Sequence, residues 1–168
     1  GTYIMNVYKT RDNATLPEYA TIGSACFDIK ACLTVGERVR SYTPFNKQVD
    51  VIVKKNGLAI TPGTRVLIPT GLIFDIPVNH VMEMYIRSSV ATKMGLTLVN
   101  SVGIIDSDYV DETHIIVHNV SDTVAHVHDG DRLAQCRLAS VTQQDIKEVK
   151  KKPGTKTDRK GGIGSTGR

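Results

Sequence analysis

Asn100-Ser-Val-Gly-Ile-Ile-Asp-Ser-Asp-Tyr109 is a stretch in which two carboxylates and an aromatic ring follow closely after a glycine. The apolar pair Ile104 and Ile105 favours extended backbone, and Gly103 can adopt a positive φ that lets a β-hairpin close tightly. Asp106 follows the apolar pair directly. The stretch predicts either a hairpin whose carboxylate activates a water beside a sugar, or an ordinary acidic turn between two strands.

Short runs of alternating, β-branched residues recur on both sides of this stretch. They cover residues 3–8, 48–53, 65–68, 81–86, 114–117 and 133–141. Turn signals such as Asn56-Gly57 and Pro62-Gly63 separate them. This pattern predicts an all-β sandwich or barrel of many short strands. The exception is 88–94, where Ser88 as N-cap and Ala91 inside predict one short helix.

Composition indicates one domain with a core of its own. The chain has 168 residues, of which 40% are hydrophobic, and no interval has the composition of an interdomain linker. There is no apolar run of membrane-spanning length and no basic-then-apolar leader. We therefore expect a soluble, intracellular protein without a membrane partner.

Cysteines and histidines do not form a metal-binding pattern. Cys26, Cys32 and Cys136 are odd in number and lack C-x-x-C spacing, so we expect reduced core thiols rather than disulfides or a zinc site. His126 and His128 share a strand face by their spacing, but no Cys or carboxylate converges on them. We expect these two histidines to face solvent.

The C-terminal end is basic and rich in glycine. Its cationic residues are Lys147, Lys150, Lys151, Lys152, Lys156, Arg159, Lys160 and Arg168. The segment has almost no apolar residues with which to pack and no aromatic residues on which bases could stack. It predicts a body at 1–146 and a flexible arm at 147–168 that reaches a phosphorylated small molecule, with no nucleic-acid partner.

Four further segments accompany the opening stretch in a fixed order along the chain. They are Ser24-Ala-Cys-Phe-Asp-Ile-Lys30, Arg87-Ser-Ser-Val-Ala-Thr-Lys-Met-Gly-Leu96, Gly130-Asp-Arg-Leu-Ala-Gln-Cys136 and Arg159-Lys-Gly-Gly-Ile-Gly-Ser-Thr-Gly167. Together the five resemble the ordered motifs of the trimeric dUTP pyrophosphatases (dUTPases). The resemblance implies a homotrimer of jelly-roll-like β-barrel subunits with active sites shared between chains. It also implies Mg²⁺-dependent hydrolysis of dUTP to dUMP and pyrophosphate by water attack at the α-phosphorus.

The resemblance assigns catalytic roles to four residues. Asp106 corresponds to the general base, and Arg87 and Ser88 correspond to the pair that contacts the phosphate chain. Asp28 corresponds to the acid that supports Mg²⁺ through metal-bound water. The local alternatives are a hairpin-capping carboxylate for Asp106 and a turn-capping carboxylate for Asp28.

Substrate recognition is implied for a second set of residues. Tyr109 matches the platform beneath the deoxyribose, its alternative being an ordinary half-buried strand tyrosine, and backbone near Asn100 and Gly103 matches the uracil edge. Asp131 and Arg132 fit a surface pair as well as a functional one. The set comprises Ser89, Asn100, Gly103, Tyr109, Gln135, Arg159, Ile163, Gly164, Ser165 and Thr166.

The chain departs from the family pattern at three places. Ile163 stands where a stacking aromatic residue is usual, and Arg159 lies one position nearer the glycines than the usual lid arginine. Val110-Asp111 replaces the pair, commonly Arg-Gly, that follows the tyrosine. The first departure predicts either weaker lid closure or an aromatic residue that is supplied from elsewhere.

The segment 42–60 lengthens the spacing between Asp28 and Arg87 beyond that expected for the family. Its alternating valines followed by Lys54-Lys-Asn-Gly57 predict an inserted strand and hairpin. Such an insertion serves either trimer packing or an unknown protein partner. A regulatory protein-binding module is therefore one alternative to the enzyme. The related dCTP deaminase is another, but it requires a glutamate where this chain has Ile116.

Overall fold

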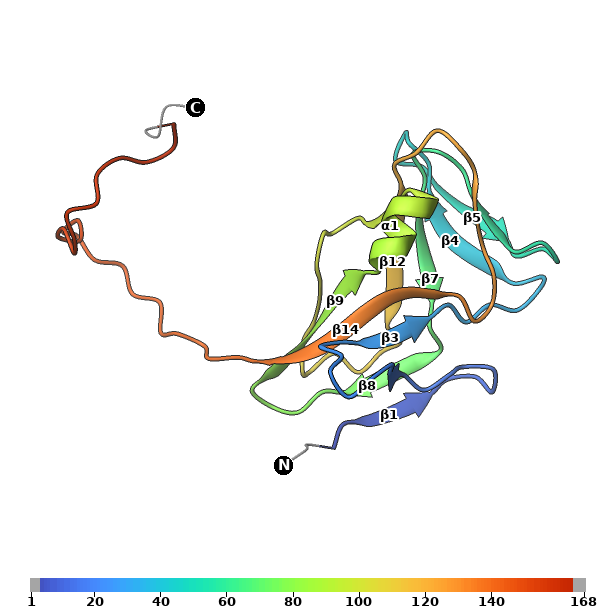
Figure 1. Cartoon of the computed structure of the whole chain (residues 1–168), viewed down its shortest axis with the longest axis horizontal. Coiled ribbons are helices and arrows are strands. Elements are labelled where there is room, and N and C mark those ends of the chain that lie inside the picture. Colours follow the sequence, from blue (N-terminus) through green and yellow to red (C-terminus); the bar gives the residue numbers. More distant parts are fainter. Residues whose placement is uncertain (1–3, 165–168) are drawn as a thin grey trace.

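Two five-stranded antiparallel sheets carry most of the computed structural model, which describes residues 4–164 (Figure 1). The first sheet has the order β11 (Gly103–Ile105), β9 (His80–Ile86), β14 (Arg132–Ser140), β3 (Phe27–Lys30) and β2 (Glu18–Tyr19). The second has the order β10 (Leu96–Leu98), β12 (His114–Asn119), β7 (Arg65–Pro69), β4 (Arg38–Tyr42) and β5 (Gln48–Ile52). Two small pairs, β1 (Asn6–Lys9) with β8 (Leu72–Asp75) and β6 (Leu58–Ile60) with β13 (Ala125–Val127), complete the body.

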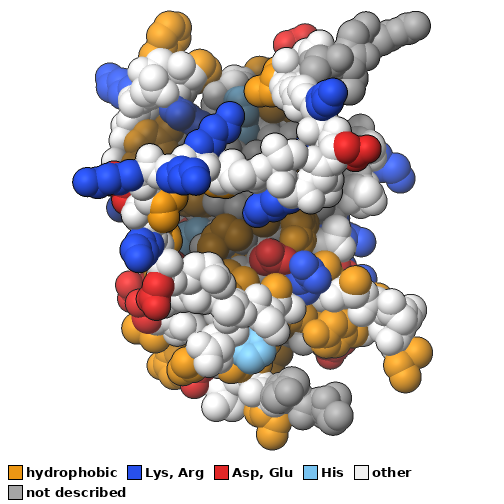
Figure 2. All heavy atoms as spheres, turned by 90° about the vertical axis from the view of Figure 1, so that its left-hand side faces the viewer, with side chains coloured by type: hydrophobic (Ala, Val, Ile, Leu, Met, Phe, Trp, Pro, Cys, Tyr) orange, Lys and Arg blue, Asp and Glu red, His pale blue; other side chains and the backbone are white. Residues whose placement is uncertain are grey.

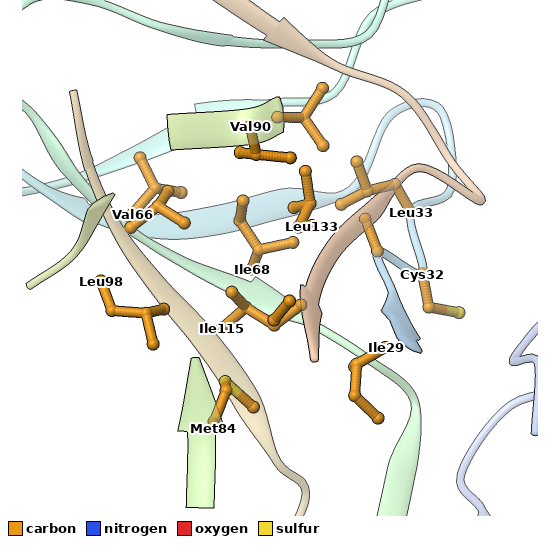
Figure 3. Close-up of a cluster of buried hydrophobic side chains, with 14 of the residues drawn as sticks. Ile29, Cys32, Leu33, Val66, Ile68, Met84, Val90, Leu98, Ile115 and Leu133 are labelled. Atoms are coloured by element: carbon orange, nitrogen blue, oxygen red, sulfur yellow. The ribbon is translucent and has the colours of Figure 1, made fainter. Parts of the chain in front are cut away.

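Alternation along the strands supplies one core between the sheets. Ile115 on β12 and Ile68 on β7 point inward from the second sheet, and Ile29 on β3 and Met84 on β9 do so from the first (Figure 3). All four are at most 2% exposed, and each such side chain contributes roughly 1.5–3 kcal/mol by leaving water. The all-β, jelly-roll-like prediction is confirmed, although strand pairing within residues 4–164 does not close into a full barrel.

Each of the six predicted alternating runs contains a strand, with boundaries shifted by a few residues; Tyr3, the start of the first run, lies outside the described residues. The predicted helix is present as α1 (Ser88–Met94). Its N-cap, however, is Arg87 rather than Ser88, and no side chain caps it. Arg87 is the last extended residue after β9, so the strand runs directly into the helix. The helix ends at Met94, and its C-cap Gly95 adopts φ 66°.

The predicted turn Lys54-Lys-Asn-Gly57 is present after β5, because Lys54 and Gly57 exchange backbone hydrogen bonds of 3.1 and 2.9 Å. A second hairpin, formed by β4 and β5, begins before residue 42. Strands β4 and β5 pair from Arg38↔Ile52 to Tyr42↔Gln48, and Asn46 adopts φ 64° in their turn. Arg65 of β7 donates to the Thr43 carbonyl at 3.2 Å and to Asn46 Oδ1 at 2.7 Å. The turn is thus held from the neighbouring strand, while β5 remains a sheet edge.

The C-terminal segment leaves the body where β14 ends. Every residue from Val141 to Gly164 is exposed, and none belongs to a helix or strand. In Figure 1 the segment extends away from the sheets. We call residues 141–164 the arm; it begins earlier than the predicted residue 147. Between residues 4 and 164, none of the helices is long and apolar enough to cross a bilayer.

Candidate active site

A polar pocket of about 320 Å³ lies on the outer face of the first sheet. It is lined by Ala20, Ser24, Ala25, Cys26, Asp28, Arg87, Ser88 and Gln135. Strand register explains the grouping, because Asp28 on β3 lies opposite Gln135 on β14. Arg87 and Ser88 join them where β9 passes into α1. The structure therefore brings together four predicted site residues from three separate segments.

Within the polar pocket, Asp28 orients the arginine. Asp28 Oδ1 is 3.5 Å from Arg87 Nε, and Oδ2 is 4.0 Å from Arg132 Nη1. Arg87 Nη1 also donates to the Arg132 carbonyl at 3.2 Å, and Gln135 Nε2 donates to the Ile86 carbonyl at 3.3 Å. Partly exposed pairs of this kind add at most about 1 kcal/mol to stability. Their effect is positional, since they hold a guanidinium fork ready for an anion.

A second pocket, of about 250 Å³, lies beside the connection between β10 and β11. Within residues 96–119, all of which the structure describes, the predicted hairpin is absent, because β10 pairs with β12 whereas β11 pairs with β9 in the other sheet. We call this pocket the hairpin pocket after the stretch that was expected to form the hairpin. Its walls are mostly apolar. It is lined by Leu67, Met84, Leu98, Asn100, Gly103, Ile104, Ile105, Asp106, Tyr109, Thr113, His114 and Ile116. Four predicted site residues of the opening stretch thus meet here.

The turn that connects β10 with β11 depends on a different residue from the one predicted. Ser101 carries the positive φ, 65°, whereas Gly103 is not among the described glycines with positive φ. Gly103 is instead required for close approach, because a Cβ there would lie 2.9 Å from Met84 Cβ. The expected role of Gly103 in turn geometry is wrong, and its role is to let β11 pack against β9.

Residues 106–112 form the loop that carries the acid and the ring, and we call them the catalytic loop. Asp106 is exposed, and the Tyr109 amide donates to its carbonyl at 3.1 Å. Tyr109 Oη donates to the Glu112 carbonyl at 2.9 Å. Burial, with smaller effects of Asp111 and Glu112, raises the pKa of Tyr109, so the hydroxyl stays protonated.

The geometry of the catalytic loop explains Asp111, the second residue of the pair that replaces the usual Arg-Gly after the tyrosine. Asp111 is exposed and is not among the described residues with positive φ. Glycine is therefore unnecessary at this position. Nothing in the structure explains Val110, which is 65% exposed.

Several predicted site residues lie outside both pockets. Ser89 is half-buried on α1 and lines neither of them. Arg159, Ile163 and Gly164 belong to the exposed arm. Ser165 and Thr166 lie outside the described residues. No lining residue is common to the polar pocket and the hairpin pocket.

Sequence reasoning missed some pocket residues. Ser24 and Cys26 line the polar pocket, and both lie in the quoted first motif, which could have indicated them. Cys26 is half-buried rather than in the core, whereas Cys32 and Cys136 are buried as predicted. Thr113 and His114 follow the catalytic loop into β12, and only the fold shows that they reach the hairpin pocket.

A metal ion at the polar pocket would take most of its coordination from a bound phosphate compound and from water, and little from the protein. No group of three or more His, Cys, Asp or Glu residues gathers within residues 4–164, and His126 and His128 are exposed as predicted. Asp28 is the one carboxylate among the residues that line the polar pocket. Magnesium commonly keeps several waters and binds through phosphates plus one or two carboxylates. The donor set therefore fits magnesium bound to a polyphosphate.

The surface charge favours an anionic ligand. Figure 2 looks at the molecule from the side toward which the arm extends, and more Lys and Arg than Asp and Glu side chains project there. The whole chain carries a net charge of +4. Such a charge raises the local concentration of anions near the surface.

Comparisons with a family model and with curated relatives indicate the same family. The family model described as dUTPase matches residues 47–167. A deoxyuridine 5'-triphosphate nucleotidohydrolase of Bdellovibrio bacteriovorus is 35% identical, with 91% of this chain and 88% of that protein covered. Its counterpart in Rhizobium meliloti is 37% identical, with 90% and 82% covered.

Solved structures agree with the sequence relatives. The dUTPase of Streptococcus mutans superposes with a TM-score of 0.63 at 27% identity, with 84% of this chain and 98% of that chain covered. The dUTPase of Staphylococcus bacteriophage 80alpha, solved with dUPNHPP, gives a TM-score of 0.74 with 99% and 100% covered. At 20% identity the phage structure supports the fold alone.

Proposed function

The chain belongs to the dUTPase family and is a dUTP diphosphatase, and from this premise we propose how its two pockets divide the reaction. The hairpin pocket takes the deoxyuridine, and the polar pocket takes the triphosphate with Mg²⁺. The observation that carries the proposal is the segregation of the predicted residues into one mostly apolar and one polar pocket.

Pocket size and separation support sites shared between chains. Pockets for drug-sized ligands usually measure about 300–1,000 Å³, so a pocket of about 250 Å³ suits a nucleoside better than a whole nucleoside triphosphate. Because the two pockets share no residue, a complete site is best explained by the hairpin pocket of one subunit facing the polar pocket of another. A homotrimer would contain three such sites.

Asp106 acts as the general base in this scheme. An exposed carboxylate at the rim of the hairpin pocket can hold a water in line with the leaving oxygen of the α-phosphate. Arg87 and Ser88 of the partner pocket contact the phosphate chain, and Gln135 supplies a neutral donor. Asp28 keeps Arg87 in place and would hold a magnesium ion through water. A bound Mg²⁺ would supply charge neutralisation at the phosphate oxygens.

Specificity comes from the hairpin pocket. Tyr109 packs beneath the deoxyribose and leaves no room for a ribose 2′-hydroxyl. Backbone groups of Asn100 and Gly103 match the uracil edge and leave the cytosine amino group facing a donor, which is costly when buried. Ile116, which lines this pocket, provides no acid for deamination.

The arm closes the site in this proposal. Arg159 reaches the γ-phosphate, and the glycine-rich end from Gly161 onward folds over the nucleotide and expels water. Because the arm extends away from its own body in Figure 1, we propose that it serves the site of a neighbouring subunit. Ile163 gives apolar contact where the family usually stacks a ring.

The protein-binding alternative rests on the β4–β5 hairpin. Phe45 is 90% exposed at its tip, which suits a contact with another protein. The retention of Asp28, Arg87, Asp106 and Tyr109 in two formed pockets favours catalysis instead. A role for the hairpin in trimer packing or partner binding would add to the catalytic function.

A pyrophosphate-release assay with dUTP, dTTP, dCTP and UTP tests the proposal. We expect turnover of dUTP alone, dependent on Mg²⁺ and abolished by EDTA. Comparable rates for dUTP and dCTP would contradict the assignment of the hairpin pocket. Equal rates with and without Mg²⁺ would contradict the role of Asp28. Light scattering should give the mass of a trimer.

A further inference from the structure

We propose that Glu112 is a positioning residue that sets the preference for dUTP over UTP by fixing the ring of Tyr109. This inference rests on the proposed function, in which that ring excludes the ribose hydroxyl. Glu112 lines neither the hairpin pocket nor the polar pocket. It would therefore act through Tyr109 and not by touching the nucleotide.

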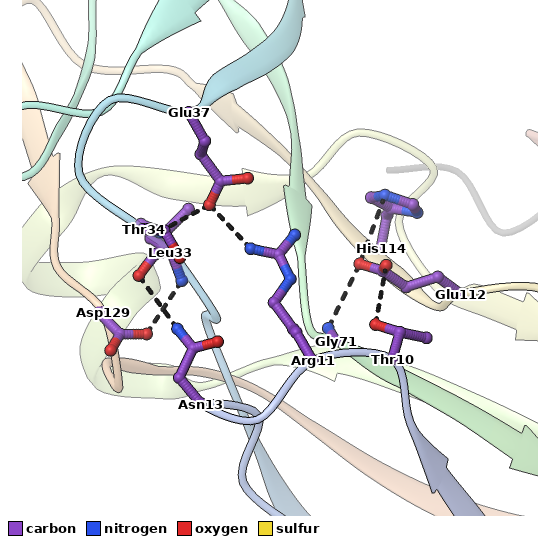
Figure 4. Close-up of polar contacts among 10 residues, drawn as sticks. All are labelled: Thr10, Arg11, Asn13, Leu33, Thr34, Glu37, Gly71, Glu112, His114 and Asp129. Atoms are coloured by element: carbon purple, nitrogen blue, oxygen red, sulfur yellow. Dashed lines mark hydrogen bonds and ion pairs between the residues drawn. The ribbon is translucent and has the colours of Figure 1, made fainter.

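The Glu112 side chain joins the catalytic loop to the body. Its Oε2 accepts from the Gly71 amide at 3.3 Å, and its Oε1 accepts from Thr10 Oγ1 at 3.3 Å (Figure 4). His114 Nε2 lies 3.8 Å from Oε2. Thr10 and Gly71 are themselves tied by a backbone hydrogen bond of 2.8 Å. One carboxylate thus bridges the end of β1, the turn before β8 and the start of β12.

The backbone of Glu112 holds the ring. Its carbonyl accepts the hydrogen bond from Tyr109 Oη at 2.9 Å. The next residue is also anchored, because the Thr113 amide donates to the Leu72 carbonyl at 2.9 Å and Thr70 Oγ1 donates to the Thr113 carbonyl at 2.6 Å. The position of the Glu112 carbonyl therefore depends on contacts at the end of the loop remote from Asp106.

Between Asp106 and Glu112 the loop has little burial to hold it. Tyr109 is 41% exposed and Val110 is 65% exposed. If the Glu112 anchor is lost, the ring can move outward without breaking a packed core. Displacements of about 1 Å in such positioning groups cost up to 10²-fold in rate. Outward movement opens space beneath C2′, so the change should favour UTP relative to dUTP.

The test compares kcat/KM for dUTP with kcat/KM for UTP in a set of variants. We expect Glu112→Ala to lower this ratio by roughly tenfold, within the range that one substrate hydroxyl contributes to discrimination. Glu112→Gln keeps an oxygen that can accept from the Gly71 amide, so it should restore most of the ratio. Thr10→Val removes one contact from a residue far from either pocket and should lower the ratio by a smaller factor.

Two control variants distinguish a failure of the proposed role of Glu112 from a failure of the proposed role of Tyr109. Glu37→Gln alters a carboxylate in the same region that contacts Arg11 and Thr34 but not the catalytic loop, and it should leave the ratio unchanged. Tyr109→Ala tests the premise, because an unchanged ratio in this variant would overturn the role of Tyr109 and the inference with it. A collapsed ratio in Tyr109→Ala with a normal ratio in Glu112→Ala would overturn the inference alone. If Glu112→Ala does not fold, Thr10→Val decides the question, and a normal ratio in it overturns the proposal.

Discussion

The catalytic loop and the arm both carry proposed site residues, but they differ in how they are held. The catalytic loop is tied at Glu112 to Gly71 and Thr10, and its ring is bonded within the loop. The arm has every described side chain exposed and contains no helix or strand. One region therefore has its geometry before ligand arrives, whereas the other must obtain it from the ligand or from a neighbouring subunit.

The two regions therefore suit two different tasks, the chemical step for the catalytic loop and closure of the site for the arm. The proposed base needs alignment to within about half an ångström, and Asp106 directly follows Ile105, the last residue of β11, which pairs with β9. A lid must open to release product, and segments with few buried contacts open at low cost. Changes in the catalytic loop should therefore affect turnover most, and changes in the arm should affect substrate capture.

The largest effect is expected from Asp106→Asn. Loss of the positioned base should lower kcat by a factor of about 10² or more. Nucleotide affinity and melting temperature should remain near those of the unmodified chain, because Asp106 is exposed and supports no core packing. Single-turnover kinetics with dUTP and Mg²⁺ measure the effect. Near-normal turnover would remove Asp106 from the mechanism.

The second-largest effect is expected from removal of the glycine-rich end. A chain ending at Lys160 should lose roughly 10- to 100-fold in kcat/KM, because the lid contributes positioning and water exclusion. The oligomeric mass and melting temperature should not change, since residues 161–164 are exposed. Ile146→Ala, which changes a side chain that is 98% exposed in the arm but outside the removed end, serves as the control. Full activity after truncation would show that the glycine-rich end is no lid.

Thr113→Val should stabilise the anchored region. Thr113 is 2% exposed, and its Oγ1 is buried without a hydrogen-bond partner. An unsatisfied buried hydroxyl costs about 1–3 kcal/mol, so an isosteric apolar side chain should raise the free energy of unfolding by roughly 1 kcal/mol. Urea unfolding at one fixed subunit concentration measures this gain. Thr70→Val is the contrasting variant and should destabilise, because Thr70 Oγ1 donates to the Thr113 carbonyl.

Ile163→Phe should give the smallest effect and the opposite sign from truncation. An aromatic ring adds about 0.5–1.5 kcal/mol when it stacks, so kcat/KM for dUTP should rise by a few-fold through tighter closure. Val149→Phe places the same ring elsewhere in the arm and should not change activity. Equal increases in kcat/KM for both variants would indicate nonspecific hydrophobic contact by the arm and not stacking on the base.

Local pattern was enough to predict much of the fold. Alternation located β9 and β12, because their buried side chains alternate with less buried ones. Runs of β-branched and apolar residues located β7 and β14, although β14 buries Leu133 and Ala134 in succession at a bulge. Strands β2, β3, β6, β8, β10 and β13 lie outside the predicted runs because they have only two to four residues each. Strand β4 was missed because Arg38–Tyr42 alternates arginines with buried Val39 and Ser41. The Ser88 cap failed because β9 continues directly into α1, a connection that local pattern does not reveal.

The candidate site was predictable residue by residue but not in its arrangement. Motif order indicated Asp28, Arg87, Asp106 and Tyr109, yet their division between two pockets depends on sheet register and on which sheet each segment joins. The function of Gly103 was misjudged because its neighbour Met84 is distant in sequence and adjacent only through the β11–β9 pairing. Glu112 had no sequence signal, since its contacts are with turns formed by other strands.

The free edge of β5 bears on how the protein behaves at high concentration. Gln48–Ile52 combines three β-branched apolar residues with an unpaired strand edge, a composition that promotes edge-to-edge aggregation. Asp50 interrupts the apolar residues, and Lys47, Lys54 and Lys55 flank the strand. Charges at these positions act as gatekeepers against intermolecular pairing. Neutralising them would leave the chemistry of the protein unchanged but would lower its solubility.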